Sequence, residues 1–292
     1  MTDICVYVDR MLTRVEASAI VGERIPDNLT PTIKAPALGD TVRVIDNATG
    51  ELIALVTRMS ELLTAQLRVT VTGTRVDGSS GRTASMLENA GAAKIFGWMP
   101  KKVFRRREAC SPALLAATDA EANLFLSNLG GVLGRQFRKI APDIAAHDLD
   151  IMRAVDRGWL MEEESLWTSG VINKTSQLPY HRDVTNFPTW SAMPTVRFRM
   201  RGGHLHLPEY NIVFPCGDGE VTWFCGKELV HGVTPMWTKG ADAYRYSVVY
   251  YALKGMKDCG TVAEETTQAA ERRSAREKLM AELVRNKLTE AS

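Results

Sequence analysis

Short apolar segments separated by turn-forming residues fill the chain from residue 167 to residue 256. NIVFP, EVTWFC and YRYSVVYYAL are examples, and Gly, Pro, Asp or Asn lies between successive segments. Strands this short, with turn signals at close intervals, are typical of an antiparallel sandwich or barrel. This half of the chain is therefore predicted to form an antiparallel β-fold.

The first 90 residues are also predicted to be rich in strands. Residues 41–59 alternate apolar and polar side chains on both sides of a turn, which indicates a hairpin. Residues 67–76 are predicted to form another strand, and the Gly/Ser-rich residues 73–85 a loop. We expect residues 1–90 to be a strand-rich extension that packs on the core, either as flanking strands or as a small separate module.

Two helices are predicted outside the strand-rich regions. Apolar residues recur near a 3.6-residue period between residues 119 and 139, Thr118 and Glu121 form a capping-box pattern, and Pro142 marks the end. The charged tail, residues 261–292, has one thin apolar stripe and is predicted to be a surface helix packed by it. The stripe consists of Leu279, Leu283 and Val284. Residues 91–260 would then be the functional core.

Composition places few limits on what the chain binds. Lys and Arg number 36 against 34 Asp and Glu, so attraction to a polyanion must come from local clustering. The five cysteines are widely spread and form no CxxC pair, which argues against a zinc knuckle or a redox dithiol. No apolar run approaches the roughly 20 residues that span a bilayer. We expect no membrane contact and a reducing cytoplasm as the compartment.

Two histidines and an aspartate have the spacing of a metal site. His181 and Asp183 lie in YHRDVTNF, and His231 follows in LVHGVTP. Two imidazoles and one carboxylate on one face of an iron ion form the 2-His-1-carboxylate triad, which leaves open positions for a chelating co-substrate and dioxygen. A buried histidine on a β-sheet is the structural alternative.

Arg245 and Ser247 lie on a predicted strand beyond His231, in YRYSVVYY. A guanidinium grips a carboxylate through two parallel hydrogen bonds, and a residue two positions later faces the same side of a strand. The pair could therefore hold the distal carboxylate of a 2-oxo diacid whose other end chelates iron.

The full pattern resembles the Fe(II)/2-oxoglutarate dioxygenase superfamily. Its finer features resemble the TET/JBP branch of DNA base hydroxylases. Four segments carry this resemblance: FGWMPKKVFRRREAC (96–110), YHRDVTNF (180–187), GGHLHLPEY (202–210) and LVHGVTP…RYSVVYYAL (229–253). The resemblance implies an α+β fold with a double-stranded β-helix (jelly-roll, cupin-like) core and flanking helices. It also implies Fe(II), 2-oxoglutarate as co-substrate, O2 as oxidant, and catalytic roles for His181, Asp183, His231 and Arg245.

The resemblance further implies the substrate: the 5-methyl group of 5-methylcytosine or thymine in DNA, hydroxylated once or oxidised further. Inside a duplex that group is out of reach of a recessed iron, so the base must be flipped out or single-stranded. Compact members of this branch occur in phages, fungi and protists, and among these we expect a bacteriophage protein acting in the host cell cytoplasm.

Two residues near the triad are predicted to contact substrate. Asn186 corresponds to a family position near the flipped base, and its amide offers both a donor and an acceptor. Arg182, between two metal ligands, must point away from iron and is predicted to reach a substrate phosphate. Leu253 stands where animal members have a histidine that contacts methylated cytosine, so the choice between cytosine and thymine stays open. A turn-forming Asn is the alternative for Asn186.

A basic segment, KKVFRRRE, is predicted to contact DNA. It contains Lys101, Lys102, Arg105, Arg106 and Arg107. Clustered cations beside aromatic residues can straddle phosphates near an unstacked base, although a solvated charged face would look the same.

Three other functions fit parts of the pattern. A 2-oxoglutarate-dependent hydroxylase of a protein side chain or small molecule would keep the triad and the Arg-x-Ser pair. A non-catalytic DNA-binding module would have no need of the pair. A zinc hydrolase can also use two histidines and an aspartate, but it leaves Arg245 and Ser247 unexplained.

Overall fold

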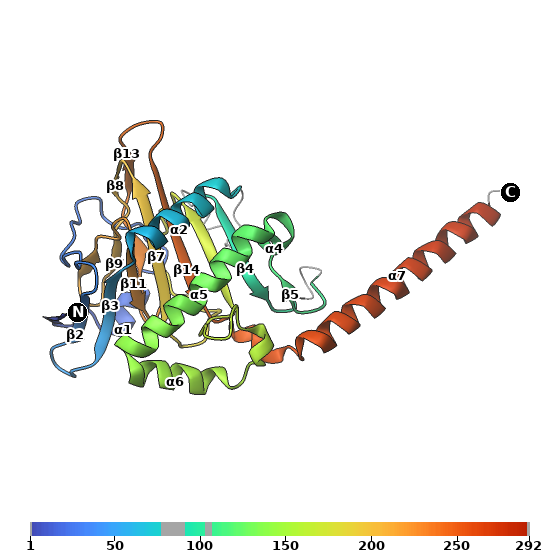
Figure 1. The fold of residues 1–292 in the computed structure, drawn as a ribbon, viewed down its shortest axis with the longest axis horizontal. Coiled ribbons are helices and arrows are strands. Elements are labelled where there is room, and N and C mark those ends of the chain that lie inside the picture. The colour runs from blue at the N-terminus through green and yellow to red at the C-terminus, as the bar shows by residue number, and fades with distance from the viewer. Residues whose placement is uncertain (1, 77–90, 103–106, 291–292) are drawn as a thin grey trace.

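The computed structural model describes residues 2–76, 91–102 and 107–290. Within these, the largest sheet has nine strands in the order β1-β2-β3-β11-β7-β14-β6-β4-β5 (Figure 1). The strands are β1 (Asp3–Val8), β2 (Thr41–Asp46), β3 (Leu52–Arg58), β4 (Ala93–Met99), β5 (Ser111–Pro112), β6 (Ser169–Lys174), β7 (Ser191–Phe198), β11 (Glu220–Phe224) and β14 (Tyr244–Tyr251). Only β1 and β2 pair in parallel.

A three-stranded sheet packs against one face of the large sheet. Its order is β10-β9-β12, formed by Ile212–Phe214, Leu205–Leu207 and Gly232–Val233. Apolar side chains from both sheets share one buried cluster, in which Met193 and Phe224 of the large sheet meet Leu205 and Phe214 of the small one. A separate two-stranded ribbon pairs β8 (Met200–Gly202) with β13 (Met236–Thr238). Two antiparallel sheets packed face to face are the arrangement predicted for the core.

The N-terminal strands continue the large sheet. β3 pairs with β11 over five residue pairs, from Arg58 opposite Glu220 to Ala54 opposite Phe224. β2 pairs with β3, and β1 with β2. Of the two arrangements open from the sequence, the structure therefore shows flanking strands.

The strand predicted over residues 67–76 is wrong, because helix α2 spans Glu61–Gly73. Ser60 caps it by accepting a hydrogen bond from the amide of Leu63. Thr64, Leu67 and Val71 are buried at helical spacing, so packing of one face outweighs the β preference of the threonines and valines. The loop predicted over residues 73–85 lies outside the described residues from residue 77 onward.

Helices α2 and α5 lie across the other face of the large sheet (Figure 1). α5 spans Ala120–Ile140, in agreement with the predicted helix. Its buried face includes Phe137, whose ring stacks on Trp223 with centroids 5.4 Å apart. Burial of large aromatic rings between helix and sheet is a main source of stability in such a layer.

The start of α5 differs in detail from the prediction, whereas its end at Ile140, just before Pro142, agrees with it. The capping box at Thr118 is wrong, because the side chain of Asp119 accepts the hydrogen bond from Ala122 while the Thr118 hydroxyl donates to the Leu114 carbonyl. Pro142 is the first residue of the next helix, α6 (Pro142–Met152). Proline is tolerated there because the amides of a first helical turn have no hydrogen-bond partner within the helix, so the missing amide hydrogen costs nothing. The described residues also form the short helices α1 (Arg14–Ala19), α4 (Leu114–Thr118), η2 (Arg157–Trp159) and η3 (Lys254–Asp258).

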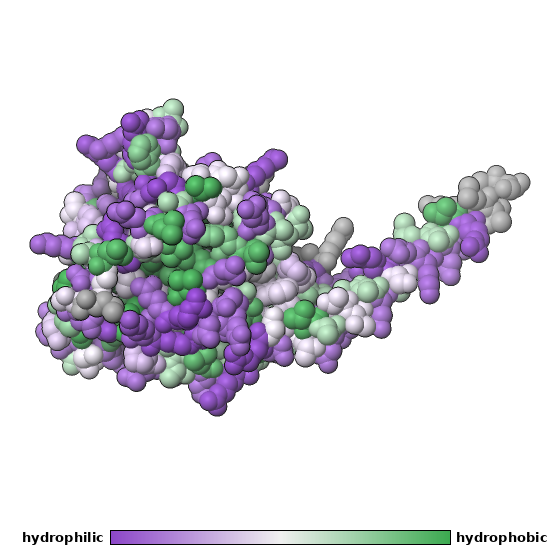
Figure 2. Space-filling model, viewed as in Figure 1, coloured by the Kyte–Doolittle hydropathy of each residue, from purple (hydrophilic) through white to green (hydrophobic). Residues whose placement is uncertain are grey.

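The C-terminal helix α7, Val262–Glu290, extends away from the body of the protein (Figure 1). The prediction that its apolar stripe packs on the core is wrong: Leu279, Leu283 and Val284 are 55%, 48% and 54% exposed. Figure 2 shows green side chains among purple ones toward the far end of this helix. Among the described residues, no helix is long and apolar enough to cross a membrane.

Cys110 and Cys259 form a disulfide across a sequence separation of 149 residues. The spacing of the cysteines did not indicate it, because the two residues meet only where the β4–β5 hairpin lies beside η3. Cys5, Cys216 and Cys225 are free thiols.

Candidate metal centre

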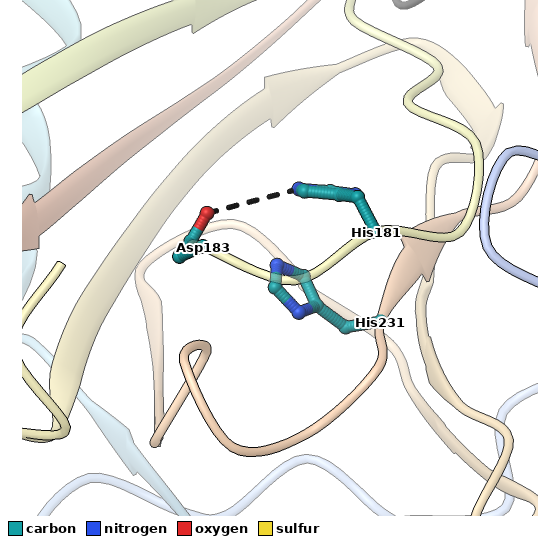
Figure 3. A group of neighbouring side chains, drawn as sticks. All are labelled: His181, Asp183 and His231. Atoms are coloured by element: carbon teal, nitrogen blue, oxygen red, sulfur yellow. Dashed lines mark ion pairs between the residues drawn. The ribbon is translucent and has the colours of Figure 1, made fainter. Parts of the chain in front are cut away.

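The two histidines of the predicted triad are direct neighbours across a short antiparallel bridge. The amide of His181 donates to the carbonyl of His231 at 2.9 Å, and the amide of His231 donates to the carbonyl of His181 at 3.0 Å. Paired residues on adjacent strands project side chains to the same face, and the two ring centroids lie 4.2 Å apart. The backbone therefore places the two imidazole rings side by side (Figure 3).

Hydrogen bonds fix the orientation of both rings. Nδ1 of His181 lies 2.8 Å from the carbonyl oxygen of Pro179, and Nδ1 of His231 lies 3.0 Å from that of Leu229. A neutral imidazole that donates from Nδ1 presents the lone pair of Nε2 to the other side. Both histidines are therefore held in the form that binds a metal through Nε2.

Asp183 completes the group. Its Oδ1 lies 3.9 Å from Nε2 of His181, and one ligand atom from each of the three residues lies within 4.8 Å of the others (Figure 3). The Asp183 amide donates to the carbonyl of Gly226 at 2.9 Å. A Cβ at residue 226 would lie 2.5 Å from Oδ2 of Asp183, so glycine leaves the space that the carboxylate occupies. The donor set and its spacing fit one metal ion such as Fe(II).

Burial keeps His231 neutral. Loss of solvation lowers the pKa of His231 to about 4, and the neighbouring His181 lowers it as well. A ring that stays unprotonated near neutral pH remains available as a ligand.

Arg245 lies on β14 and has no ion-pair partner among the described residues. Its side chain is fully buried, and its Nη1 donates to Oγ of Ser247 at 3.4 Å. Nε and Nη2 have no hydrogen-bond partner within the part of the chain that the structure describes. A buried unpaired guanidinium is costly, and burial lowers the pKa of Arg245. These free donors fit the distal carboxylate of 2-oxoglutarate, which would supply the missing negative charge.

The neighbours of Arg245 leave its two free nitrogen atoms available. Arg197 lies directly opposite on β7, and its guanidinium donates hydrogen bonds to backbone carbonyls. Gly203 has a φ of +68°, and a Cβ there would lie 2.7 Å from Cδ of Arg245. Gly203, in the segment GGHLHLPEY, therefore leaves the space that the Arg245 side chain occupies.

Thr195 is a candidate co-substrate contact that the sequence did not indicate. It lies opposite Ser247 in the β7–β14 register, so both side chains face the same side of the sheet. Its hydroxyl is fully buried and has no hydrogen-bond partner among the described residues. Its position opposite Ser247 follows only from the β7–β14 pairing register, which the sequence did not indicate.

The triad opens into a cavity of about 590 Å³. Ser247 and Asn186 line this cavity, and so do Lys101 and Lys102 of the predicted basic segment. Leu253 lines it beside Asn186, and the two residues form an isolated antiparallel bridge. The structure therefore brings most of the predicted site residues to one cavity.

Some of the predicted contacts have other surroundings or lie outside the described residues. Arg182 points away from the triad, as expected, and its guanidinium pairs with the fully buried Glu209 at 3.3 Å. Arg107 pairs with Lys102 through backbone hydrogen bonds, and its side chain donates to the Pro100 carbonyl. The two further arginines of the basic segment, Arg105 and Arg106, lie outside the described residues.

A jelly-roll core with two histidines, one carboxylate and a buried arginine defines a candidate mononuclear metal centre of the facial-triad class. Comparison with solved structures finds the same fold in NgTET1 in complex with 5mC DNA, with a TM-score of 0.55 and 16% sequence identity over 84% of this chain and 90% of that one. The predicted double-stranded β-helix core is confirmed, and the resemblance to the TET branch is confirmed at the level of the fold.

Two further solved structures are similar at lower scores. OsALKBH1 matches with a TM-score of 0.40 and 11% identity over 68% of this chain and 96% of that one. IDO from Bacillus thuringiensis matches with a TM-score of 0.38 and 11% identity over 68% of this chain and 90% of that one. No protein-family model matches the sequence, and no curated protein has significant sequence similarity to it.

Proposed function

We propose that this protein is an Fe(II)- and 2-oxoglutarate-dependent dioxygenase that hydroxylates the 5-methyl group of a pyrimidine base in DNA. The observation that carries the proposal is the position of Arg245. A fully buried guanidinium with free donors lies next to Ser247, and Ser247 shares a cavity with the triad. A zinc hydrolase has no use for such a clamp.

Each residue of the centre has a role in this proposal. His181, Asp183 and His231 would hold Fe(II), and Arg245 with Ser247 would pair with the distal carboxylate of 2-oxoglutarate. With O2, this centre supplies a two-electron oxidation in which one oxygen atom enters the substrate C–H bond and the other enters succinate, while carbon dioxide leaves. The protein's part is to place the methyl group near the metal and to exclude bulk water.

Three observations support a DNA base as the substrate. The fold matches a structure that contains 5mC DNA, lysines line the cavity, and Asn186 lines it beside Leu253. An amide can donate to or accept from the edge of a pyrimidine. To enter such a cavity, the base would leave the stack or be single-stranded from the start.

The test is nucleoside mass spectrometry on DNA treated with the protein, Fe(II), ascorbate and 2-oxoglutarate. One substrate contains 5-methylcytosine, and the other contains only unmodified bases, thymine among them. We expect a gain of one oxygen on a 5-methylpyrimidine, and the base that gains it identifies the target.

Asp183→Ala should abolish this product, whereas Asp27→Ala at an exposed position serves as the matched control. Succinate formation without any oxidised base would exclude DNA as the substrate and favour a protein or small-molecule hydroxylase. Base oxidation by Asp183→Ala at the rate of the unaltered protein would overturn the metal assignment.

A further inference from the structure

Four lysines surround the cavity that contains the triad, and two of them lie outside the basic segment identified in the sequence. Lys101 and Lys102 follow β4, whereas Lys254 and Lys257 belong to η3. All four are exposed and line the same cavity as the triad. We propose that these residues, here called the lysine rim, bind the DNA backbone around the target nucleotide, and that Lys254 and Lys257 are its principal new phosphate contacts. This inference rests on the proposed function.

The two halves of the rim form one structural unit. Gly255 of η3 packs on Pro100, so closely that a Cβ at residue 255 would lie 3.0 Å from Cβ of Pro100. The disulfide between Cys110 and Cys259 joins the same two segments covalently. The lysines therefore keep a defined spacing, and that lowers the entropy cost of binding a phosphate backbone.

A buried carboxylate provides a third connection. Glu265 is 2% exposed and accepts hydrogen bonds from the amides of Cys110 and Gly260, at 3.0 and 3.1 Å. Its Oε1 also lies 3.5 Å from Nζ of Lys101. One side chain at the base of α7 thus anchors both halves of the rim.

The rim is continuous with the wall that contains Asn186. The amide of Lys254 donates to the carbonyl of Thr185 at 3.0 Å, and Leu253 forms the bridge with Asn186. A phosphate held by η3 would therefore be fixed relative to the residue proposed to contact the base. This geometry suits a flipped nucleotide, whose sugar and phosphate stay at the mouth while the base enters the cavity.

The charge of the rim is available for a ligand. Lys102, Lys254 and Lys257 have no ion-pair partner among the residues that the structure describes. Asp258 is the one acidic residue, apart from the ligand Asp183, among the described residues that line the cavity. Excess positive charge at a cavity mouth attracts phosphates, and the release of their counterions makes such binding depend on salt.

The test compares Lys254→Gln/Lys257→Gln with the unaltered protein. The matched control is Lys34→Gln/Lys239→Gln, two exposed lysines that do not line this cavity. Fluorescence anisotropy gives the Kd for an oligonucleotide containing 5-methylcytosine at a series of salt concentrations. Loss of two phosphate contacts should weaken binding and reduce the slope of log K against log salt by about 1.4 to 1.8.

Two accompanying measurements separate the possible outcomes. Binding of 2-oxoglutarate with Mn(II), followed by calorimetry without DNA, should be unchanged in both variants. If Lys254→Gln/Lys257→Gln has the DNA affinity and salt slope of the unaltered protein, the proposed role of the lysine rim is wrong. A loss of 2-oxoglutarate binding with DNA binding intact would also contradict it. If the unaltered protein binds and oxidises DNA, such a result refutes the DNA-contact role of the lysine rim and leaves the proposed function standing. If it neither binds nor oxidises DNA, the proposed function fails together with the rim.

Discussion

Asn186 and Leu253 face each other across an antiparallel bridge, at the wall of the cavity that holds the triad. Backbone hydrogen bonds on either side keep the two segments together: Phe187 to Ala252 at 2.9 Å and Lys254 to Thr185 at 3.0 Å. Both residues are more than nine-tenths buried. An amide and an apolar side chain are thus fixed next to each other, three residues past the proposed metal ligand Asp183 and eight residues past Arg245, respectively.

Asn186→Ala should reduce base oxidation about tenfold, because a hydrogen bond of about 1 to 1.5 kcal/mol to the base edge is lost. The backbone contacts of residue 186 do not involve the amide side chain, so the fold and the binding of 2-oxoglutarate should be retained. Initial rates of product formation on 5-methylpyrimidine DNA measure the effect, with Asn28→Ala as an exposed control. A rate equal to that of the unaltered protein would show that Asn186 does not contact the base.

Arg245→Met should separate stability from co-substrate binding. Methionine has a similar length and removes an unpaired buried charge, so the free energy of unfolding of the ligand-free protein should stay the same or rise. The affinity for 2-oxoglutarate should fall roughly 100-fold or more, since two charge-assisted hydrogen bonds are lost.

Thermal unfolding with Mn(II), with and without 2-oxoglutarate, measures both effects of Arg245→Met. The unaltered protein should gain Tm on addition of 2-oxoglutarate, and the variant should not. Arg199→Met is the control, because Arg199 is exposed and already paired with Asp242. An undiminished gain in the variant would place the co-substrate elsewhere.

Asp148 should make stability depend on pH. It is 1% exposed, and burial raises its pKa to about 7, while a hydrogen bond from the Trp190 amide lowers the pKa in part. The folded protein thus holds a proton that the unfolded chain releases above the ordinary value of 3.8. The contribution of Asp148 is present in full below pH 3.8 and is lost, by roughly 1.4 kcal/mol per pH unit, as the pH rises to about 7.

Asp148→Asn removes this titration. The variant and the unaltered protein should have similar free energies of unfolding near pH 4, and the variant should be the more stable of the two at pH 8. Urea unfolding at both pH values measures the difference, and Asp150→Asn on the exposed face of α6 is the control. A difference that does not change with pH would show that Asp148 is ionised throughout.

The residues that could be predicted from the sequence are those whose chemistry depends on short spacing. Arg245 and Ser247 lie two positions apart on strand β14 and so face the same side of it, and His181 and Asp183 lie two positions apart in one short segment, so each pair is close in space whatever the rest of the fold. The position of Thr195 opposite Ser247 and the position of Lys254 at the cavity could not be predicted, because both depend on contacts between distant segments.

Local patterns also misled where tertiary packing decides the outcome. Residues 67–73 have the composition of a strand, yet Leu67 and Val71 are buried on one face of a helix against the large sheet. The apolar stripe of α7 looked like a packing face, but α7 extends beyond the core, and no described part of the chain covers Leu279 or Leu283.

The disulfide between Cys110 and Cys259 should stabilise the protein by about 2 to 4 kcal/mol, because it closes a long loop in the unfolded chain. Unfolding in urea with and without a reductant measures this contribution. Cys110→Ser/Cys259→Ser should match the reduced protein and should not respond to reductant, whereas Cys5→Ser, at an exposed free thiol, should behave as the unaltered protein does. In denaturant without reductant, three of the five cysteines should react with a thiol reagent. Reaction of all five, with unfolding unaffected by reductant, would show that the bond is not formed.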